Sequence, residues 1–420
     1  MTKDRKTFLK NITWAVVGAC VVYGCASQGA PRDRSITLAL SNPLATAREE
    51  VVTVSVPEDI EVRGKVLKTG FYQSGQGQIE CVDLDGNGLV DQLYASIKLG
   101  ANESVSFDLL KDLIPITDQS QKKTQAELSV MKGGQWNGRK YEGGTGFVNV
   151  DHLRVADEHT DHSFDIRYEG PGWENEQIGY RFYLDWRNAM DIFGKKVDTL
   201  VLQQVGQDGF DSYHEDSPWG MDVLKAGKTL GIGSIGQFVA GTVEHFEQTD
   251  SVLCHITLNG NISSIIDTRY YGWATSVDKM YLESTLKIDT KDRAVEHQIK
   301  LDQMVSGFCT GLVKKPDVEK LESLVEANGW AYIATYGQQS LAGDNLGLAI
   351  VFNAKDVDYV KEAEKDHVVV FKPTTEKFSY YLLGAWEQEK NGITTKEAFK
   401  TYLNGKVERL NNPVIAKVVW

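Results

Sequence analysis

The chain has 420 residues, of which 41% are hydrophobic and 25% charged, so it is long enough for one large core or two domains. A net charge of -13 argues against a nucleic-acid-binding protein, which would need a basic face, but not against an anionic sugar held by local arginines. Glycine (39) far outnumbers proline (9) and aromatic residues make up 10%, which favours a β-rich protein.

The N-terminus has the pattern of a bacterial lipoprotein signal peptide. A basic region at 3–10 precedes an apolar stretch at 12–22, too short for a membrane span, which ends at Gly24 and Cys25. We expect residues 1–24 to be removed and Cys25 to be lipidated; an ordinary signal peptide with an incidental cysteine is the alternative. No acidic cluster follows Cys25, which favours the periplasmic face of a Gram-negative membrane, with contact to the membrane through the lipid anchor alone.

We expect a small N-terminal β-sandwich over residues 25–115, after a short tether. Residues 51–56 alternate between apolar and polar side chains as a strand should, and similar patterns occupy 78–82, 92–97 and 104–109. The polar stretch 116–124 is expected to link this sandwich to a main domain at 126–420.

The loop between two strands of this sandwich has two interpretations. Asp83, Asp85, Asn87 and Asp91 have the spacing of ligands one, three, five and nine of a calcium-binding loop. Position twelve is Tyr94 rather than a bidentate Glu, and a turn rich in Asp, Asn and Gly needs no metal. A structural Ca²⁺ ion and a plain turn both stay open, and no cofactor is expected to be required.

From residue 126 onward one β-pattern follows another. Strands are expected at 126–130, 147–155, 163–169, 178–187, 200–205, 252–259, 280–288, 294–301, 330–336, 346–352, 368–371 and 378–386. Short helices are expected after Asp317, which would cap a helix that stops at Gly329, and after the capping box 394–397. Many strands with few helices predict a mostly β protein whose main domain is a large antiparallel two-sheet sandwich.

The segment 168–225 concentrates aromatic, basic and acidic side chains, and we take it as the candidate active site. On a strand at 178–188, alternation would place Tyr180, Phe182, Leu184 and Trp186 on a core face, opposite Arg181, Tyr183, Asp185 and Arg187. Because arginine is costly to bury unpaired, the second face would either meet solvent with cross-strand ion pairs or line a pocket for a sugar carboxylate.

The loop downstream adds His214, whose imidazole ordinarily titrates near neutrality, although a lone histidine is more often structural. Adjacent residues on an extended chain point apart, so its tyrosine partner is expected from another strand, such as Tyr180 or Tyr183, rather than Tyr213. The same argument keeps His159 and His162 from chelating one metal ion. The candidate catalytic residues are His214, Tyr183, Tyr213, Arg187, Arg181 and Asp185; the candidate substrate-binding residues are Trp173, Glu174, His162, Trp219, Asp222 and Lys225.

Several motifs together resemble one family of Bacteroidetes lipoproteins, catalogued as domain of unknown function 4861. They are GPGWE at 170–174, YRFYLDWRN at 180–188, DIFGK at 191–195, SYHE at 212–215, WGMDVLK at 219–225, GIGS at 231–234 and TGLVK at 310–314. The resemblance covers nearly the whole mature chain. The family loop usually has Asp and Glu where this chain has Asn87 and Gln92, which weakens the case for Ca²⁺.

The resemblance implies a role in polysaccharide utilisation, a sandwich like that of mutarotases, and dehydration of a terminal uronic acid to the 4,5-unsaturated sugar. For that reaction Arg181 and Arg187 would neutralise the carboxylate, His214 would take the C5 proton, and Tyr183 or Tyr213 would protonate the oxygen leaving C4. A hydroxyl leaving group makes a dehydratase, and a glycosidic oxygen makes a polysaccharide lyase. We expect such a lyase acting on uronic-acid-containing oligosaccharides; a non-catalytic glycan-binding lipoprotein and a glycoside hydrolase or mutarotase-like isomerase are the alternatives.

Overall fold

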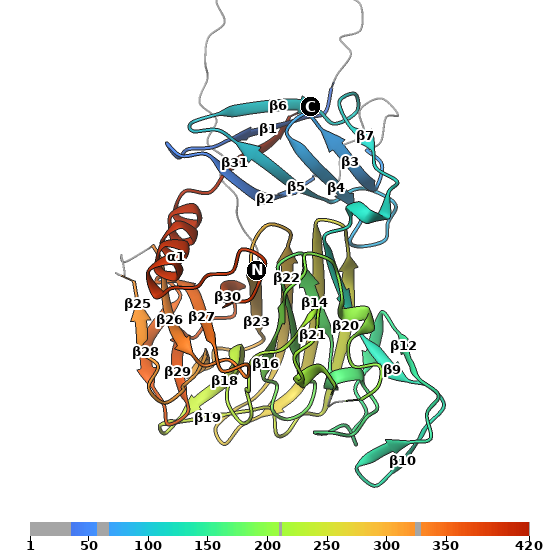
Figure 1. Ribbon diagram of the computed structural model, residues 1–420, viewed down its shortest axis with the longest axis vertical. Helices are drawn as coiled ribbons and strands as arrows, with labels where there is room; N and C mark the ends of the chain where they lie inside the picture. The colour runs from blue at the N-terminus through green and yellow to red at the C-terminus, as the bar shows by residue number, and fades with distance from the viewer. Residues whose placement is uncertain (1–34, 57–66, 210–211, 324–328, 420) are drawn as a thin grey trace, which may run out of the picture. The chain divides into compact units, whose positions relative to one another are not determined.

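The computed structural model describes residues 35–56, 67–209, 212–323 and 329–419, which lie in one compact unit beginning at Ser35 (Figure 1). The predicted signal peptide and Cys25 lie outside these ranges. Within them, all the strand pairs of the sheets are antiparallel, so the prediction of a mostly β protein built from antiparallel sheets is confirmed. No helix in the described part of the chain has the length and apolar character to cross a membrane.

The N-terminal part is a small sandwich of two sheets around its own core, which includes Leu38, Ile79 and Leu93. One sheet has the order β31 (Ile415–Val419), β1 (Thr37–Ser41), β6 (Ser104–Asp108). The other has the order β2 (Arg48–Ser55), β5 (Gln92–Leu99), β4 (Gly77–Val82), β3 (Gly70–Ser74), β7 (Ile114–Pro115).

The final strand of the chain corrects the predicted boundary between the domains. Strand β31 lies beside β1, with Thr37 opposite Val419, and so belongs to the N-terminal sandwich rather than to a main domain at 126–420. The physical reason is that β6 pairs with one edge of β1, and β31 supplies the hydrogen bonds that the other edge of β1 needs.

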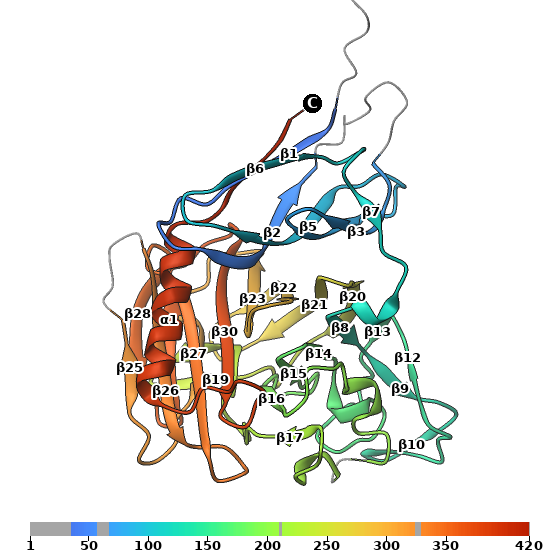
Figure 2. The ribbon, with the colours of Figure 1, turned by 45° about the horizontal axis from the view of Figure 1, so that its top comes forward.

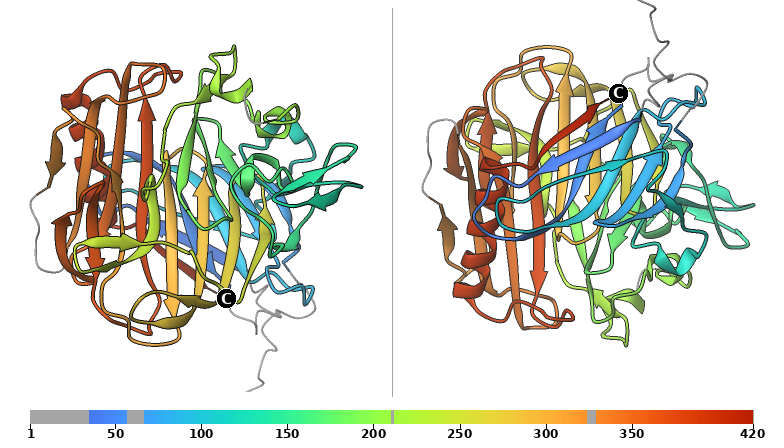
Figure 3. Two further views of the ribbon diagram at one scale, coloured as in Figure 1. Left: turned by 90° about the horizontal axis from the view of Figure 1, so that it is seen from below. Right: turned by 90° about the horizontal axis from the view of Figure 1, so that it is seen from above.

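The main part consists of two layers of strands around one large core, visible in Figures 2 and 3. One layer is a nine-stranded sheet with the order β13 (His152–Arg154), β20 (Ser251–Asn259), β21 (Ser263–Ala274), β22 (Lys279–Asp289), β23 (Ala294–Leu301), β30 (Phe378–Trp386), β27 (Asn345–Asn353), β26 (Trp330–Gln338), β25 (Lys320–Glu322).

The other layer is built from two five-stranded sheets. The first, which carries the candidate site, has the order β17 (Gly220–Asp222), β16 (Met190–Lys195), β15 (Ile178–Phe182), β14 (Gly172–Asn175), β8 (Thr124–Glu127). The second has the order β19 (Thr242–Glu244), β18 (Ile232–Val239), β24 (Phe308–Val313), β29 (Asp366–Phe371), β28 (Val357–Glu362). Trp173, Ile192 and Phe308 of this layer share one core with Leu282 and Ile350 of the nine-stranded sheet, as in a two-layer sandwich.

Shorter elements connect these sheets. They are β9 (Ser129–Met131), β10 (Gln135–Asn137), β11 (Lys140–Glu142), β12 (Phe147–Asn149) and the 3-10 helices η1 (Gln119–Gln121), η2 (Arg167–Glu169), η3 (Leu202–Gln204) and η4 (Ser212–His214). The helix α1 (Lys396–Asn411) begins one residue later than the capping box 394–397 predicts, because Thr395 is the N-cap and accepts a hydrogen bond from the backbone N–H of Ala398; the helix buries Phe399 and Leu403.

Three predicted elements are wrong. The helix expected after Asp317 is the edge strand β25 over Lys320–Glu322, because pairing with β26 satisfies its backbone; residues 324–328 lie outside the described ranges. The strands expected at 163–169 and 200–205 contain the 3-10 helices η2 and η3 instead. In η2 the backbone of Tyr168 and Glu169 has positive φ (38° and 70°), which is incompatible with a strand.

Candidate active site

A buried charged cluster lies on the face of the first five-stranded sheet that is turned away from the core. Arg181 on β15 lies opposite Asp191 on β16, and Asp222 ends β17. Alternation turns these three side chains away from Tyr180 and Ile192, which belong to the core. One guanidinium nitrogen of Arg181, Nη2, lies 2.7 Å from Oδ2 of Asp222 and 3.2 Å from Oδ2 of Asp191. Two carboxylates therefore share one buried cation.

Two tyrosines complete this cluster. The hydroxyl of Tyr183 donates to Oδ2 of Asp191, and the hydroxyl of Tyr213 accepts from Nη1 of Arg181 at 2.9 Å. The guanidinium of Arg181 also lies over both rings, about 5 Å from each centroid. Burial raises the pKa of Tyr213 to about 12 and the pKa of Tyr183 well above its ordinary value, although the charge of Arg181 opposes both shifts. Both phenols are therefore protonated at neutral pH.

His214 connects this cluster to the surface. Its Nδ1 lies 3.3 Å from Oδ2 of Asp222; the side chain of His214 is 43% exposed, whereas that of Asp222 is 1% exposed. Burial and the neighbouring charge of Asp191 raise the pKa of Asp222 well above its ordinary value, against the opposing effect of Arg181. An exposed imidazole backed by a buried carboxylate is the arrangement that orients a general base or acid.

The predicted partner of His214 is wrong. Residues 212–214 form the 3-10 helix η4 rather than an extended chain, so adjacent side chains do not point apart. The rings of Tyr213 and His214 consequently lie side by side, with centroids 4.6 Å apart, and the carboxylate of Asp222 contacts the imidazole. Asp222, predicted to bind substrate, thus belongs to the buried part of the cluster.

Arg187 does not share a strand face with Arg181, because β15 ends at Phe182. The guanidinium of Arg187 lies 2.5 Å from Asp185, 3.0 Å from Asp161 and 3.1 Å from Glu169, and it stacks 3.9 Å from the ring centroid of Tyr183. Of the two interpretations of this face, the cross-strand ion pairs are present, between Arg181 and the carboxylates of Asp191 and Asp222, but they are buried rather than exposed to solvent. Arg187 also holds carboxylates of the protein.

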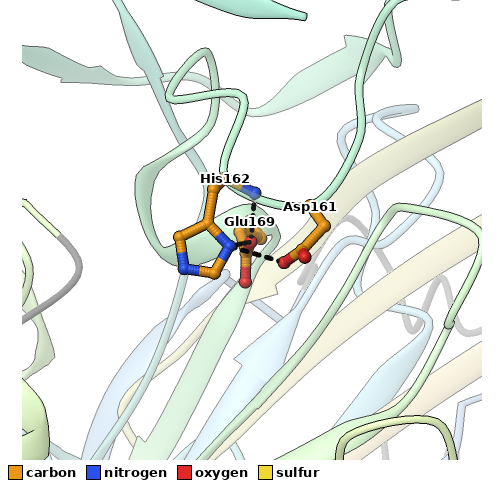
Figure 4. Close-up of side chains that lie close together, drawn as sticks. All are labelled: Asp161, His162 and Glu169. Carbon is orange, nitrogen blue, oxygen red and sulfur yellow. Dashed lines mark hydrogen bonds and ion pairs between the residues drawn. The ribbon is translucent and has the colours of Figure 1, made fainter.

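His162 lies in a second cluster beside Arg187 (Figure 4). Its Nδ1 is 2.6 Å from Oδ1 of Asp161, and its backbone N–H donates to Oε1 of Glu169 at 2.7 Å. The donor atoms of these three side chains are close enough to hold a metal ion. Arg187, however, already neutralises the carboxylates of Asp161 and Glu169, and its charge disfavours a second cation beside them. His159 contacts a different carboxylate, that of Asp165, at 2.8 Å.

Two predicted substrate-binding residues on β14 are internal, which corrects their assignment. Trp173 is buried in the core, where it stacks on Tyr180 with ring centroids 5.8 Å apart. Glu174 is buried against Lys195, whose ammonium nitrogen lies 2.5 Å from its Oε2. The sequence did not show this because strands of this sheet are covered on both faces, so polar alternation does not mark a solvent-facing side.

The remaining predicted residues lie nearer the surface. Trp219 is half-buried against the ring of Phe193, with centroids 6.1 Å apart. Lys225 is exposed, and its side chain has no hydrogen bond or ion pair with the described residues. Lys315, which the sequence did not single out, donates from Nζ to the backbone oxygen of Lys225 at 3.0 Å. Burial lowers the pKa of Lys315, as does the charge of Lys225, whereas the charge of Asp191 raises it.

The loop proposed for Ca²⁺ gathers Asp83, Asp85 and Asp91, whose carboxylate oxygens lie within 4.8 Å of one another. Each carboxylate also accepts hydrogen bonds inside the loop. Asp91 accepts from the N–H of Leu84 at 2.9 Å, and the Asn87 amide donates to Asp85 at 3.0 Å. The carboxylates of the loop thus have hydrogen-bond partners within the turn itself. They are also close enough together to hold a cation.

A sequence model of the family described as "Domain of unknown function (DUF4861)" matches residues 40–415. No curated protein sequence matches. Two similar solved structures are an alpha-mannosidase from Enterococcus faecalis V583 (TM-score 0.46) and a protein in the glycosyl hydrolase family 38 from Enterococcus faecalis (TM-score 0.42). Each is 11% identical and covers 92% of this chain, which spans 46% and 47% of their respective lengths.

Proposed function

The chain belongs to the family described as Domain of unknown function (DUF4861), and we propose that it is a carbohydrate-active lyase. Its substrate would be an oligosaccharide that contains uronic acid, from which it eliminates water or a glycosidic oxygen. The observation that carries this proposal is the exposed imidazole of His214, held at 3.3 Å by the buried carboxylate of Asp222. A proton-transfer group that is both oriented and accessible is what abstraction of a C5 proton requires.

In the proposed reaction His214 takes the proton from C5, the C4–O bond breaks, and a double bond forms between C4 and C5. Asp222 orients the imidazole through the contact between its Oδ2 and Nδ1 of His214 at 3.3 Å. Arg181 acts through Asp222 as a positioning residue, because its guanidinium is buried and paired.

The leaving oxygen needs a proton, and hydrogen bonding alone favours Tyr213 over Tyr183 as its donor, because both side chains are buried, at 2% and 5% exposed. The hydroxyl of Tyr183 already donates its proton to Asp191, whereas the hydroxyl of Tyr213 accepts from Arg181 and has no acceptor for its own proton among the described residues. The ring of Tyr213 also lies against that of His214. With the raised pKa of about 12, Tyr213 stays protonated until the leaving group takes the proton.

Lys225 and Lys315 replace the arginines as the groups that would neutralise the uronate carboxylate. Arg181 and Arg187 are committed to internal carboxylates, but the ammonium group of Lys225 is exposed and has no ion pair with the described residues. Lys315 lies beside it and is within electrostatic range of Asp191. Two neighbouring cations that lower the cost of a carbanion next to a carboxylate supply the electrostatic part of the catalysis. Lipidation at Cys25 would hold the enzyme at the periplasmic face of the membrane.

The experiment incubates the protein with a panel of uronic-acid-containing oligosaccharides and follows the ultraviolet absorbance of the conjugated 4,5-unsaturated uronate. We expect the absorbance to rise with the wild type and His214→Ala to lose roughly 10²–10⁴-fold in rate. The matched control is His152→Ala, which removes an exposed histidine from the edge of the nine-stranded sheet and should retain activity.

Three outcomes would contradict the proposal. Reducing ends released without unsaturation would indicate a glycoside hydrolase. Binding of the panel without any reaction would indicate a glycan-binding protein. An active His214→Ala variant would remove His214 from the role of base.

A further inference from the structure

Trp186 does not lie in the core, where strand alternation placed it. Strand β15 ends at Phe182, so alternation stops there, and Trp186 lies half-buried in the loop 183–189 that leads into β16. Two cavities, of about 720 Å³ and about 580 Å³, meet at this side chain, and both are lined by Trp186 and Glu247. Cavities of this size, with an aromatic wall and a few polar groups, are typical of small-molecule sites.

The charged groups that line the larger cavity are of two kinds, those with an ion pair inside the protein and those without one. Three carboxylates are of the first kind: Asp157 pairs with Arg154 at 2.8 Å, Asp185 with Arg187 at 2.5 Å, and Asp250 with Lys279 at 2.9 Å.

Glu158, Glu247 and Arg139 line the same cavity and have no ion pair or hydrogen bond with the described part of the chain. Arg139 comes from the hairpin of β10 and β11, far from the others in sequence.

A buried histidine is a further unused group at this cavity. The side chain of His159 is 1% exposed, and its Nδ1 lies 2.8 Å from Oδ1 of Asp165. Its other nitrogen, Nε2, is buried and has no hydrogen-bond partner among the described residues. A buried polar atom without a partner costs free energy unless something outside the chain satisfies it. His159 lines the larger cavity, so a ligand bound in that cavity would lie next to the His159 side chain.

We infer that Trp186 is the platform of a subsite that binds a pyranose ring of the oligosaccharide. The ammonium nitrogen of Lys228 lies 5.3 Å from the centroid of the indole, and the ring also borders both cavities, where it offers apolar surface to the C–H groups of a sugar. The carboxylates of Glu158 and Glu247 accept hydrogen bonds from sugar hydroxyls, and the guanidinium of Arg139 donates to them. The inference rests on the proposed function for the nature of the ligand, and adds to it where a second sugar residue lies.

The unpaired charges around Trp186 balance. Against the carboxylates of Glu158 and Glu247 stand two cations, Arg139 and Lys228, and the ammonium nitrogen of Lys228 lies 5.3 Å from the centroid of the Trp186 ring. The cations Lys225 and Lys315 belong instead to the candidate active site.

The two places are joined through the loop itself, because Arg187 follows Trp186 and stacks on Tyr183, whose hydroxyl donates to Asp191 of the catalytic cluster. The substrate is accordingly an oligosaccharide whose second sugar residue lies at Trp186, next to the uronate.

The test measures binding by titration calorimetry on the full chain. The probes are a xylan-derived aldotetraouronic acid, a rhamnogalacturonan tetrasaccharide and a desulfated chondroitin tetrasaccharide, each compared with free glucuronic or galacturonic acid. We expect at least one oligosaccharide to bind roughly tenfold more tightly than the free acids, and Trp186→Ala to remove about that factor. Tyr359→Ala, which truncates an exposed aromatic side chain outside both cavities, should bind as the wild type does.

A second variant protects the test against misfolding of Trp186→Ala. Glu247→Gln changes an exposed side chain that lines both cavities, and it should weaken oligosaccharide binding several-fold by removing a charged acceptor. The inference is overturned if wild type binds no oligosaccharide better than the free acids, or if both variants bind as tightly as the wild type. If binding depends on Trp186 but no unsaturated product forms, the proposed function alone is refuted. If product forms and both variants keep the KM of the wild type, this inference alone is refuted.

Discussion

Asp366, at the start of β29, offers a quantitative test of the electrostatics of this fold. The residue is 3% exposed, and its Oδ1 accepts a hydrogen bond from the backbone N–H of Leu230 at 2.8 Å. Burial raises its pKa from 3.8 to about 7, although this hydrogen bond and the charge of Lys365 oppose the shift. Because the folded state holds the proton more tightly than the unfolded state, the associated stability is present below pH 3.8 and is lost as the pH rises to about 7.

The size of this loss follows from the shift. Each pKa unit corresponds to 1.36 kcal/mol, so a shift of about three units corresponds to about 4 kcal/mol. Asp366→Asn removes the ionisable group and keeps an oxygen to accept from Leu230. The variant is therefore expected to match the wild type near pH 4 and to be more stable by up to about 4 kcal/mol near pH 8.

Urea unfolding of both proteins at acidic and alkaline pH measures this difference. The control is Asp358→Asn on the neighbouring strand β28, an exposed carboxylate whose replacement should change the free energy of unfolding by no more than about 0.5 kcal/mol at either pH. If the difference between Asp366→Asn and the wild type is the same at both pH values, the reasoning from burial is refuted.

Two further predictions concern the buried ion pair and the acidic loop. Lys195→Met leaves Glu174 buried without its cation and should lower the free energy of unfolding by about 3–5 kcal/mol in urea titrations; an unchanged midpoint would show that the pair contributes little. Chelation with EDTA should leave the melting temperature unchanged, because Asp83, Asp85 and Asp91 accept hydrogen bonds within their own loop; a decrease that Ca²⁺ restores would identify the loop as a structural calcium site.

Local patterns in the sequence predicted the fold class and several single elements. The alternation of Tyr180, Arg181 and Phe182 correctly separates two core aromatics from a charged side chain, because the period of a strand is a local property of the backbone. The capping residue Thr395 likewise marks the start of α1, because capping needs only atoms within one turn. The residue types at the candidate site were also visible in the sequence as an unusual concentration of Tyr, Arg, His and Asp.

The surroundings of those residues depended on segments distant in the chain. Arg181 is buried because η2, η3 and η4 fold over its sheet and bring in Tyr168, Leu202 and Tyr213, and its charge is offset by carboxylates from two other strands. A period of two residues tells which face a side chain takes, but it carries no information about what covers that face.

The segment 168–225 shows the same division. Strand alternation assigns the face of Arg181 while β15 lasts and fails at Trp186, where hydrogen bonding between strands has already ended. Burial of charge, the contact of His214 with Asp222, and the cavities beside Trp186 arise from non-local packing, whose free energy depends on the whole tertiary arrangement rather than on neighbouring residues.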